Sequence, residues 1–404
     1  MATSKGIGSI RGRGVRSTVA RMWNTLSPLL ALLLWMLLPA HAWAQQPPLV
    51  GPATQLWDAA EGFEFAGSDK KVRKIRQSVS GVACAPSGAG QPVCLFALDE
   101  GSAASFAQLD PTGQKLLPLG QAVPLLGAAT GELDAEGAAT DGHFFYVTGS
   151  HSNKRSDCAA NPDSRHVIRL RRDPSTGQAL RSASGAFVNY ADTGRLWDVM
   201  AQLPALRPLL GHCLGEDGAK AFGLNIEGLA VRGGRLYFGL RGPVQSGAAW
   251  VLAVDAEALF SASVDVKPTL YRLALGAHRG IRDMLAVDNG LLILAGPDDT
   301  DTRPAPDWTV VWWDAQPPGA GATEAAFGAA KSKVVALPVV STPRTLATLD
   351  LRQVKKRACD KEVKPEAITL LQSDATHYRL LVLSDGLCDG GAQVFEVPRE
   401  PPRR

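Results

Sequence analysis

The sequence lacks the short motifs that mark many enzyme and nucleotide-binding sites. Its 404 residues contain no G-x-S-x-G, no H-E-x-x-H, no P-loop and no Rossmann fingerprint that opens a helix. These absences prevent any assignment of activity from a single local motif. They leave open an enzyme whose site is assembled from separated loops.

Long apolar runs are also missing. The apolar stretch at residues 29–38 is shorter than the ~20 residues that cross a bilayer, and no later stretch reaches that length. Basic residues precede this stretch, and Ala42-Trp43-Ala44 follows it as a small-x-small cleavage site. The pattern predicts a secretory signal peptide at residues 1–44 and a periplasmic or secreted mature protein. No membrane span is expected once the signal is removed.

An excess of charge of one sign is absent too. The whole chain holds 42 basic and 39 acidic residues, and the first 44 residues hold five basic and no acidic ones. The predicted mature chain therefore has a net charge of −2. This balance gives no indication of a nucleic-acid partner or of binding to an anionic membrane.

Cysteines number only six, and none stands in a C-x-x-C motif or in a Cys/His spacing that fits zinc. An even count in an exported chain favours disulfides, with free buried thiols as the alternative for some of them. Sequence alone does not decide the pairing. We predict the pairs that lie within one repeat or bracket one insertion: Cys84–Cys94, Cys158–Cys213 and Cys359–Cys388.

A hairpin-like unit recurs along the chain, and its clearest copy is residues 225–247. That copy contains two apolar runs separated by Gly233-Gly234, which is a strong hairpin pattern. Copies that begin at Asp134 and Arg282 align with it without gaps, the latter with Gly290 on Gly234. Two weaker copies begin at Pro365, where the turn is longer, and at Ser80.

The spacing of these copies predicts an all-β fold, a β-propeller of four-stranded blades. Two steps between copies are 56 residues, close to the ~40–50-residue period of propeller blades. Five blades are visible, and the weak boundaries at both ends leave room for a sixth. Helical spacing of apolar residues in residues 194–222 predicts one helical insertion. The predicted parts are a signal peptide at residues 1–44 and a leading segment at 45–79 that closes the last blade. The propeller follows at 80–397, and a tail at 398–404.

Four acidic residues fall at equivalent places in the aligned copies, with Ser80 in the fifth: Glu136, Glu227, Asp283 and Glu366. If the strand after each acid is innermost, these side chains gather at one mouth of the central channel. Converging carboxylates could bind a divalent cation such as Ca²⁺, bind a cationic ligand, or supply a general acid and base. The structural alternative, which we favour, is that each acid accepts hydrogen bonds from backbone N–H groups of the next blade.

A second set of candidates follows the second strand of each copy, where the residue types differ. Arg241 could bind a carboxylate or phosphate, His151 could act as a base near neutral pH, and Asp385 is near-equivalent to Arg241. A surface hydrogen bond or salt bridge is the alternative for each. One acidic loop is a weak calcium candidate because it lacks the spacing and closing Glu of an EF-hand: Asp298, Asp299 and Asp301.

Two short stretches carry a resemblance to a known family. The segments N-I-E-G-L-A at residues 225–230 and G-L-R-G-P at residues 239–243 resemble a bacterial family known as domain of unknown function 3616. The resemblance implies no activity. More loosely, the E-G-(L/A)-(A/T) pattern is similar to that of exported phytase-like and esterase-like propellers, and no catalytic residue is carried over from them.

The sequence therefore supports two hypotheses about function. The favoured one is an exported binding module that takes a small ligand or an envelope protein at the channel mouth. The alternative is a metal-dependent phosphoester or ester hydrolase, in which the four aligned acids hold a cation and Arg241 binds the anionic substrate.

Overall fold

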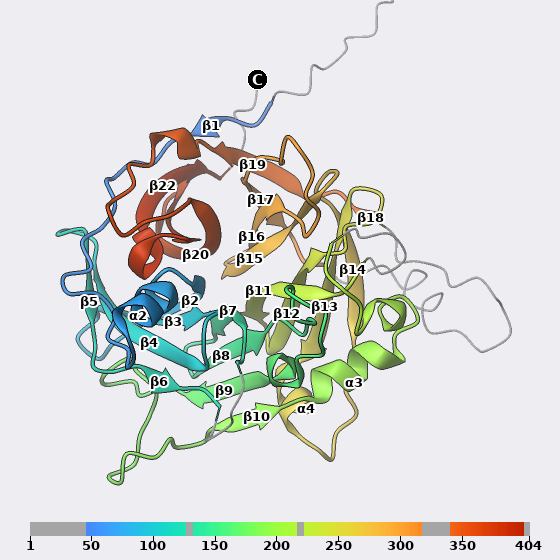
Figure 1. The fold of residues 1–404 in the computed structure, drawn as a ribbon, viewed down its shortest axis with the longest axis horizontal. Helices are drawn as coiled ribbons and strands as arrows, with labels where there is room; N and C mark the ends of the chain where they lie inside the picture. Colours follow the sequence, from blue (N-terminus) through green and yellow to red (C-terminus); the bar gives the residue numbers. More distant parts are fainter. Residues whose placement is uncertain (1–45, 127–131, 216–221, 317–339, 400–404) are drawn as a thin grey trace, which may run out of the picture. The chain divides into compact units, whose positions relative to one another are not determined.

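The computed structural model describes residues 46–126, 132–215, 222–316 and 340–399. The described helices and strands belong to one compact unit, Pro47–Arg404. Five sheets surround a common axis in this unit (Figure 1), and contacts between their innermost strands close into a ring. The unit is a five-bladed β-propeller, and no sixth sheet is found among the described residues. The predicted signal peptide lies outside those residues.

The first two blades follow the predicted hairpin pattern. From the centre outward, the first blade contains β2 (Val79–Pro86), β3 (Pro92–Leu98), β4 (Ala103–Asp110) and β5 (Lys115–Pro118), with the short β6 (Val123–Pro124) beside β4. The second contains β7 (Ala135–Thr140), β8 (Phe144–Gly149), β9 (Val167–Arg171) and β10 (Ala191–Thr193).

The other three blades depart from the prediction of four strands each. The third contains β11 (Asn225–Arg232), β12 (Arg235–Gly242), β13 (Ala248–Asp255), β14 (Thr269–Ala274) and β18 (Val340–Ser341). The fourth contains β15 (Arg279–Val287), β16 (Gly290–Pro297), β17 (Thr309–Trp313), β19 (Arg344–Leu349) and β1 (Leu49–Val50). The fifth has only β20 (Lys364–Ser373), β21 (His377–Asp385) and β22 (Gln393–Pro398).

The leading segment covers the outer edge of the three-stranded fifth blade. The backbone N–H groups of Ala53 and Trp57 donate to the carbonyls of Val394 and Ala392 at 2.7 and 2.8 Å. Trp57 is only 1% exposed and packs in the core beside β22. These contacts satisfy part of an edge that would otherwise be open.

The core lies between neighbouring blades, because each inner strand packs directly on the next. A Cβ added at Gly81 would lie 2.7 Å from the backbone N of Ala138, and one at Gly137 would lie 2.8 Å from the carbonyl O of Glu227. Only glycine permits this approach. The inner strands therefore meet closely just below the mouth of the channel.

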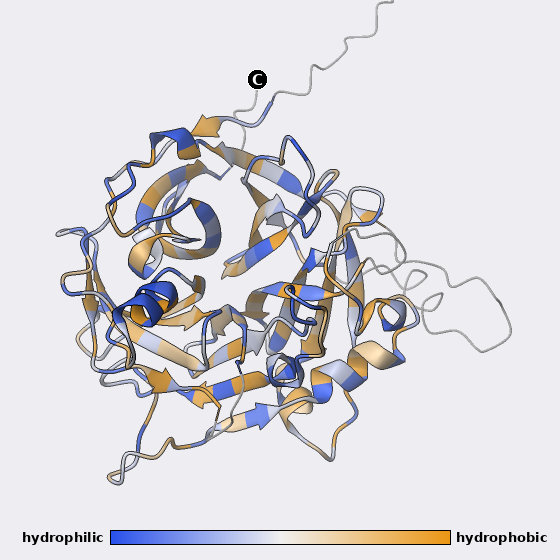
Figure 2. Ribbon diagram, in the orientation of Figure 1, coloured by the Kyte–Doolittle hydropathy of each residue, from blue (hydrophilic) through white to orange (hydrophobic). Residues whose placement is uncertain are grey.

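Helices are few among the described residues. They are α2 (Asp69–Arg76), α3 (Arg195–Gln202), α4 (Ala256–Phe260) and the short 3₁₀ turns η1 (Pro162–Arg165), η2 (Arg207–Leu209), η4 (Leu351–Gln353) and η5 (Cys388–Gly391). The predicted helical insertion corresponds to α3 and η2, whose buried face includes Leu196, Val199 and Met200. Figure 2 shows α2 as mainly hydrophilic, in keeping with its sequence D-K-K-V-R-K-I-R. Within the described residues, no helix has the length and apolar character needed to cross a membrane.

Two of the three predicted disulfides are present, Cys84–Cys94 between β2 and β3 and Cys158–Cys213. The predicted third pair is wrong for this structure, since Cys359 and Cys388 are free thiols. Their sulfurs approach within 4.8 Å, but the Cys388 thiol donates to the carbonyl O of Cys359 at 3.2 Å and is not bonded to the Cys359 sulfur. The two bonded pairs are consistent with an oxidising compartment outside the cytoplasm.

Candidate ligand-binding site

The innermost strand of every blade carries a β-bulge near its start. In β7, Ala135 pairs with Gly149 and Gly137 pairs with Thr148, which leaves Glu136 as the extra residue. A bulge re-aims the extra side chain relative to the regular alternation of the strand. The extra residues of the five blades are Ser80, Glu136, Glu227, Arg282 and Glu366.

The structure corrects one member of the predicted acidic ring, because Arg282 and not Asp283 is equivalent to Glu227. Arg232 pairs with Arg235 across one two-residue turn, and Val287 pairs with Gly290 across the other. The sequence separation between equivalent residues of these two hairpins is therefore one residue shorter than the gapless alignment gave, and Glu227 corresponds to Arg282. A slip of one residue in a strand moves a side chain to the opposite face.

Asp283 instead joins three strands inside the ring. Its side chain is fully buried, and its carboxylate accepts the backbone N–H groups of Met284 at 2.8 Å and of Ile368 in the next blade at 2.7 Å. The N–H of Leu229 in the preceding blade is a third donor. Burial raises the pKa of Asp283, and the three donors oppose that shift. The geometry therefore matches the structural alternative for this acid.

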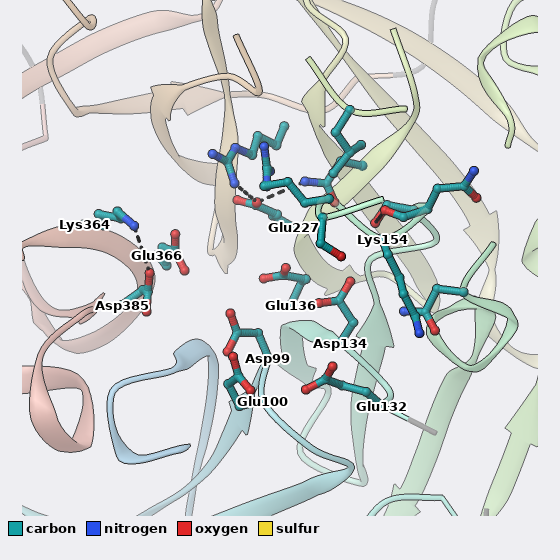
Figure 3. A pocket seen from close by; sticks show the side chains of 18 of the residues that line it. Asp99, Glu100, Glu132, Asp134, Glu136, Lys154, Glu227, Lys364, Glu366 and Asp385 are labelled. Atoms are coloured by element: carbon teal, nitrogen blue, oxygen red, sulfur yellow. Dashed lines mark hydrogen bonds and ion pairs between the residues drawn. The ribbon is translucent and has the colours of Figure 1, made fainter. Parts of the chain in front are cut away.

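A cavity of about 480 Å³ lies at the bulge end of the inner strands and is lined by residues from all five blades. Figure 3 shows carboxylates from several blades around it. The lining includes eight acidic residues: Asp99, Glu100, Glu132, Asp134, Glu136, Glu227, Glu366 and Asp385. Of the predicted ring, Glu136, Glu227 and Glu366 are thus brought together, whereas Asp283 does not line this cavity.

Two arginines close one part of the cavity wall. Arg282, only 2% exposed, forms ion pairs with Glu227 (Nε–Oε2, 2.9 Å) and with Glu366. Arg241 pairs with Glu227 (Nη1–Oε1, 2.8 Å) and with Asp299 (Nε–Oδ1, 3.3 Å). The guanidinium groups and carboxylates in this part already neutralise one another. We call Glu227, Arg241, Arg282 and Glu366 the paired half of the mouth.

The other part of the wall holds carboxylates that form no ion pair with any described residue. Within the described chain, the carboxylates of Asp99 and Glu136 accept no hydrogen bond and form no ion pair, and Oδ1 of Asp99 is buried. Among the described residues, the carboxylate of Asp134 accepts a hydrogen bond only from the Ser150 hydroxyl. We call Asp99, Asp134 and Glu136 the open half of the mouth.

The low solvation of the open half raises the pKa of each of its acids. Burial and the neighbouring carboxylates raise the pKa of Asp99 and of Glu136 well above their ordinary values. For Asp134, burial raises the pKa to about 6, although the Ser150 hydroxyl opposes the shift. Burial disfavours the ionised form of a carboxyl that has no cation beside it.

The remaining predicted candidates have different surroundings. His151 is 1% exposed, its Nδ1 contacts the carbonyl O of Gly149 at 3.0 Å, and burial lowers its pKa to about 4. Asp385 lines the cavity and pairs with Lys364 at 3.4 Å. The acidic loop does not converge on a cation site: Asp298 bonds to Thr300, Asp299 pairs with Arg155 and Arg241, and Asp301 pairs with Arg303.

A dense group of potential metal ligands occurs away from the mouth. This group consists of Cys359, Asp360 and Cys388, whose ligand atoms all lie within 4.8 Å of one another. It is the only group of three or more such residues within the described ranges. The Asp360 carboxylate already accepts hydrogen bonds from Arg357 and from the backbone N–H of Cys388. The acids of the mouth do not form such a group.

Asp134 is a cavity residue that was not predicted from the sequence, although the sequence carries a signal for it. Asp134 lies two residues before the bulge residue Glu136, and Asn225 and Lys364 hold the same place before Glu227 and Glu366. All three line the cavity. In three blades, therefore, the residue two places before the bulge residue also lines the mouth.

Comparison with protein families places the chain in one of them. The model of DUF3616, described as a protein of unknown function, matches residues 99–176 and 172–303, which together make up just over half of the chain. The chain belongs to the DUF3616 family. This agrees with the resemblance found in the sequence. No curated protein matches this DUF3616 protein.

Solved structures similar to this DUF3616 protein share little sequence with it. A GH43 β-1,3-galactosidase with galactodeoxynojirimycin is 8% identical, over 86% of this chain and 94% of that one, with a TM-score of 0.40. An α-L-arabinofuranosidase from Lactobacillus brevis is 8% identical, over 80% and 90%, with a TM-score of 0.38. A protein from Lactobacillus plantarum is 12% identical, over 79% and 70%, with a TM-score of 0.31. Likeness at this level carries no conclusion about activity.

The raised pKa of Glu136 leads to a prediction about stability. Because the folded protein holds this proton more tightly than the unfolded chain, ionisation of Glu136 destabilises the fold as pH rises past about 4.5, the ordinary value. Replacing Glu136 with Gln in this DUF3616 protein should therefore raise the melting temperature at pH 7.5. The difference from wild type should shrink toward zero near pH 4.

Thermal unfolding monitored by circular dichroism at several pH values measures this difference. Glu64→Gln, at an exposed acid outside the cavity, is the matched control and should leave the melting temperature unchanged at every pH. A lower melting temperature for Glu136→Gln at pH 7.5 would mean that the carboxylate has a stabilising partner in the fold.

Proposed function

We propose that this protein is an exported binding module whose channel mouth binds a small organic cation. The observation that carries the proposal is the open half of the mouth. Asp99, Asp134 and Glu136 line the cavity and form no ion pair with any residue that the structure describes, whereas the arginines across from them are already paired. These carboxyl groups are available to a cationic ligand, which would favour their ionised forms.

Physical chemistry favours a cationic ligand over a neutral or anionic one. A carboxylate that is partly removed from water and has no ion-pair partner is costly, and the cost is relieved when a charged donor arrives. The cavity of about 480 Å³ lies in the ~300–1,000 Å³ range of small-molecule sites. An amine or guanidinium group entering the open half would make charge-assisted hydrogen bonds that the protein itself does not supply.

The hydrolase alternative receives less support from the same geometry. Arg241, its candidate for binding an anionic substrate, is engaged by Glu227 and Asp299. Asp283, one of its four metal ligands, is engaged by backbone N–H groups outside the cavity. A binding module needs neither of these side chains.

Calorimetric titration with agmatine, a small dication that carries one amino and one guanidino group, tests the proposal. We expect saturable binding at one site in wild type. Glu136→Gln should weaken it by about 10- to 100-fold, because a hydrogen bond to a charged group contributes roughly 1.5–3 kcal/mol. Affinity should also fall as pH is lowered through about 6, since protonation of Asp134 removes its charge.

Glu64→Gln serves again as the control and should retain wild-type affinity. The proposal would be refuted by two results: no saturable binding of agmatine by folded wild type, or equal affinities for wild type and Glu136→Gln across this pH range.

A further inference from the structure

The cavity wall contains hydrogen-bond acceptors beyond its carboxylates. The side-chain oxygens of Asn153 and Asn225 are buried and have no hydrogen-bond partner, and these residues are only 7% and 2% exposed. Both residues line the cavity. The amide nitrogen of Asn153 donates to the carbonyls of Cys158 and Gly211 at 3.1 and 3.0 Å, which identifies the unpartnered atom as the oxygen. A ligand with several N–H groups could donate hydrogen bonds to these oxygens.

Six basic residues also line the cavity, and one of them differs from the rest. Lys154 forms no side-chain hydrogen bond or ion pair with any described residue. The other five each form an ion pair: Lys74, Arg155, Arg241, Arg282 and Lys364. Lys154 is therefore the positive charge of the cavity that remains available.

The backbone of Lys154 is held in place even though its side chain is exposed. Its N–H donates to the carbonyl O of Ala159 at 2.8 Å, and its carbonyl accepts the N–H of Cys158 at 2.9 Å. The Cys158–Cys213 disulfide anchors the same loop. Lys154 also follows Asn153 directly in the chain. A ligand carboxylate bound at Lys154 would therefore lie near the unpartnered side-chain oxygen of Asn153.

We propose that the ligand of the mouth is a small zwitterion, with an amino or guanidino group in the open half and a carboxylate at Lys154. This inference rests on the proposed function and adds a second recognition element to it. Asp99, Asp134 and Glu136 supply the charge for the cation, and the amide oxygens of Asn153 and Asn225 accept its further N–H groups. Lys154 makes the site prefer a dipolar molecule over a simple amine.

Arginine and agmatine test the inference because they differ only in the carboxylate. Both are titrated calorimetrically into wild type, Lys154→Ala and Lys71→Ala, the last removing an exposed lysine that does not line the cavity. Lys154→Ala should weaken arginine about tenfold and leave agmatine as tight as before or tighter. Lys71→Ala should leave both affinities unchanged.

The outcomes separate the two proposals. If Lys154→Ala changes arginine and agmatine to the same extent, or changes neither, Lys154 does not recognise a carboxylate and the zwitterion inference is overturned while cation binding stands. If wild type binds neither probe, the proposed function fails, and the inference fails with it. Circular dichroism of each variant confirms that its fold is retained.

Discussion

Replacing Arg282 with methionine is expected to lower the free energy of unfolding by about 3–5 kcal/mol, the usual cost of removing one partner from a buried ion pair. Arg282 is 2% exposed and bridges Glu227 and Glu366. Glu227 keeps Arg241 when the bridge is lost, but among the described residues Glu366 keeps only the Ser80 hydroxyl as a direct partner, at 3.2 Å. The variant thus leaves a buried carboxylate without its cation.

Urea denaturation at pH 7.5 measures this loss, and two comparisons make it specific. Arg303→Met removes an arginine whose ion pair with Asp301 is exposed, and it should change stability by less than about 1 kcal/mol. Adding Glu366→Gln to Arg282→Met should recover part of the loss, because the unpaired charge is then gone. A loss below about 1 kcal/mol for Arg282→Met would show that water enters the paired half and solvates it.

Replacing Asp283 with alanine is the second change with a large expected effect, a loss of about 3 kcal/mol or more. Its carboxylate accepts backbone N–H groups from its own strand, from β20 and from β11. A buried N–H without an acceptor costs about 1–3 kcal/mol, and alanine leaves these donors unsatisfied. The loss should appear as a weaker connection among three adjacent blades.

Asp288→Ala provides the matched comparison, since Asp288 lies at the exposed turn of the same hairpin and should be nearly neutral. Asp283→Asn keeps one acceptor oxygen and should fall between the two. Equal denaturation midpoints for Asp283→Ala and Asp288→Ala would contradict the bridging role.

The architecture could be predicted from the sequence because it depends on local pattern. The Gly233-Gly234 hairpin and its copies identify the inner strand pairs, and five such pairs define five blades. The outer strands were less predictable. β1 and β18 are short strands that join the fourth and third blades from distant parts of the chain. Pairing between distant segments leaves little local trace in composition.

The candidate site was only partly predictable, and the position of Asp283 explains why. The alignment matched Gly290 to Gly234, whereas the hairpin registers place the bulge at Arg282. Strand side chains alternate with a period of two, so an error of one residue exchanged a cavity residue for a core residue. The division into a paired and an open half depends on this exchange, because the arginine at the ring position forms ion pairs with two of the acids.

Calorimetric titration of agmatine at pH 6.5 in two buffers of different ionisation enthalpy tests the central claim most directly. If the open half receives the cation, binding lowers the raised pKa values of its acids and releases protons, so the observed heat depends on the buffer. Saturable binding with proton release in wild type, both reduced in Glu136→Gln, is the predicted result. No saturable heat, or binding that is the same in both buffers and unaffected by Glu136→Gln, would contradict the account.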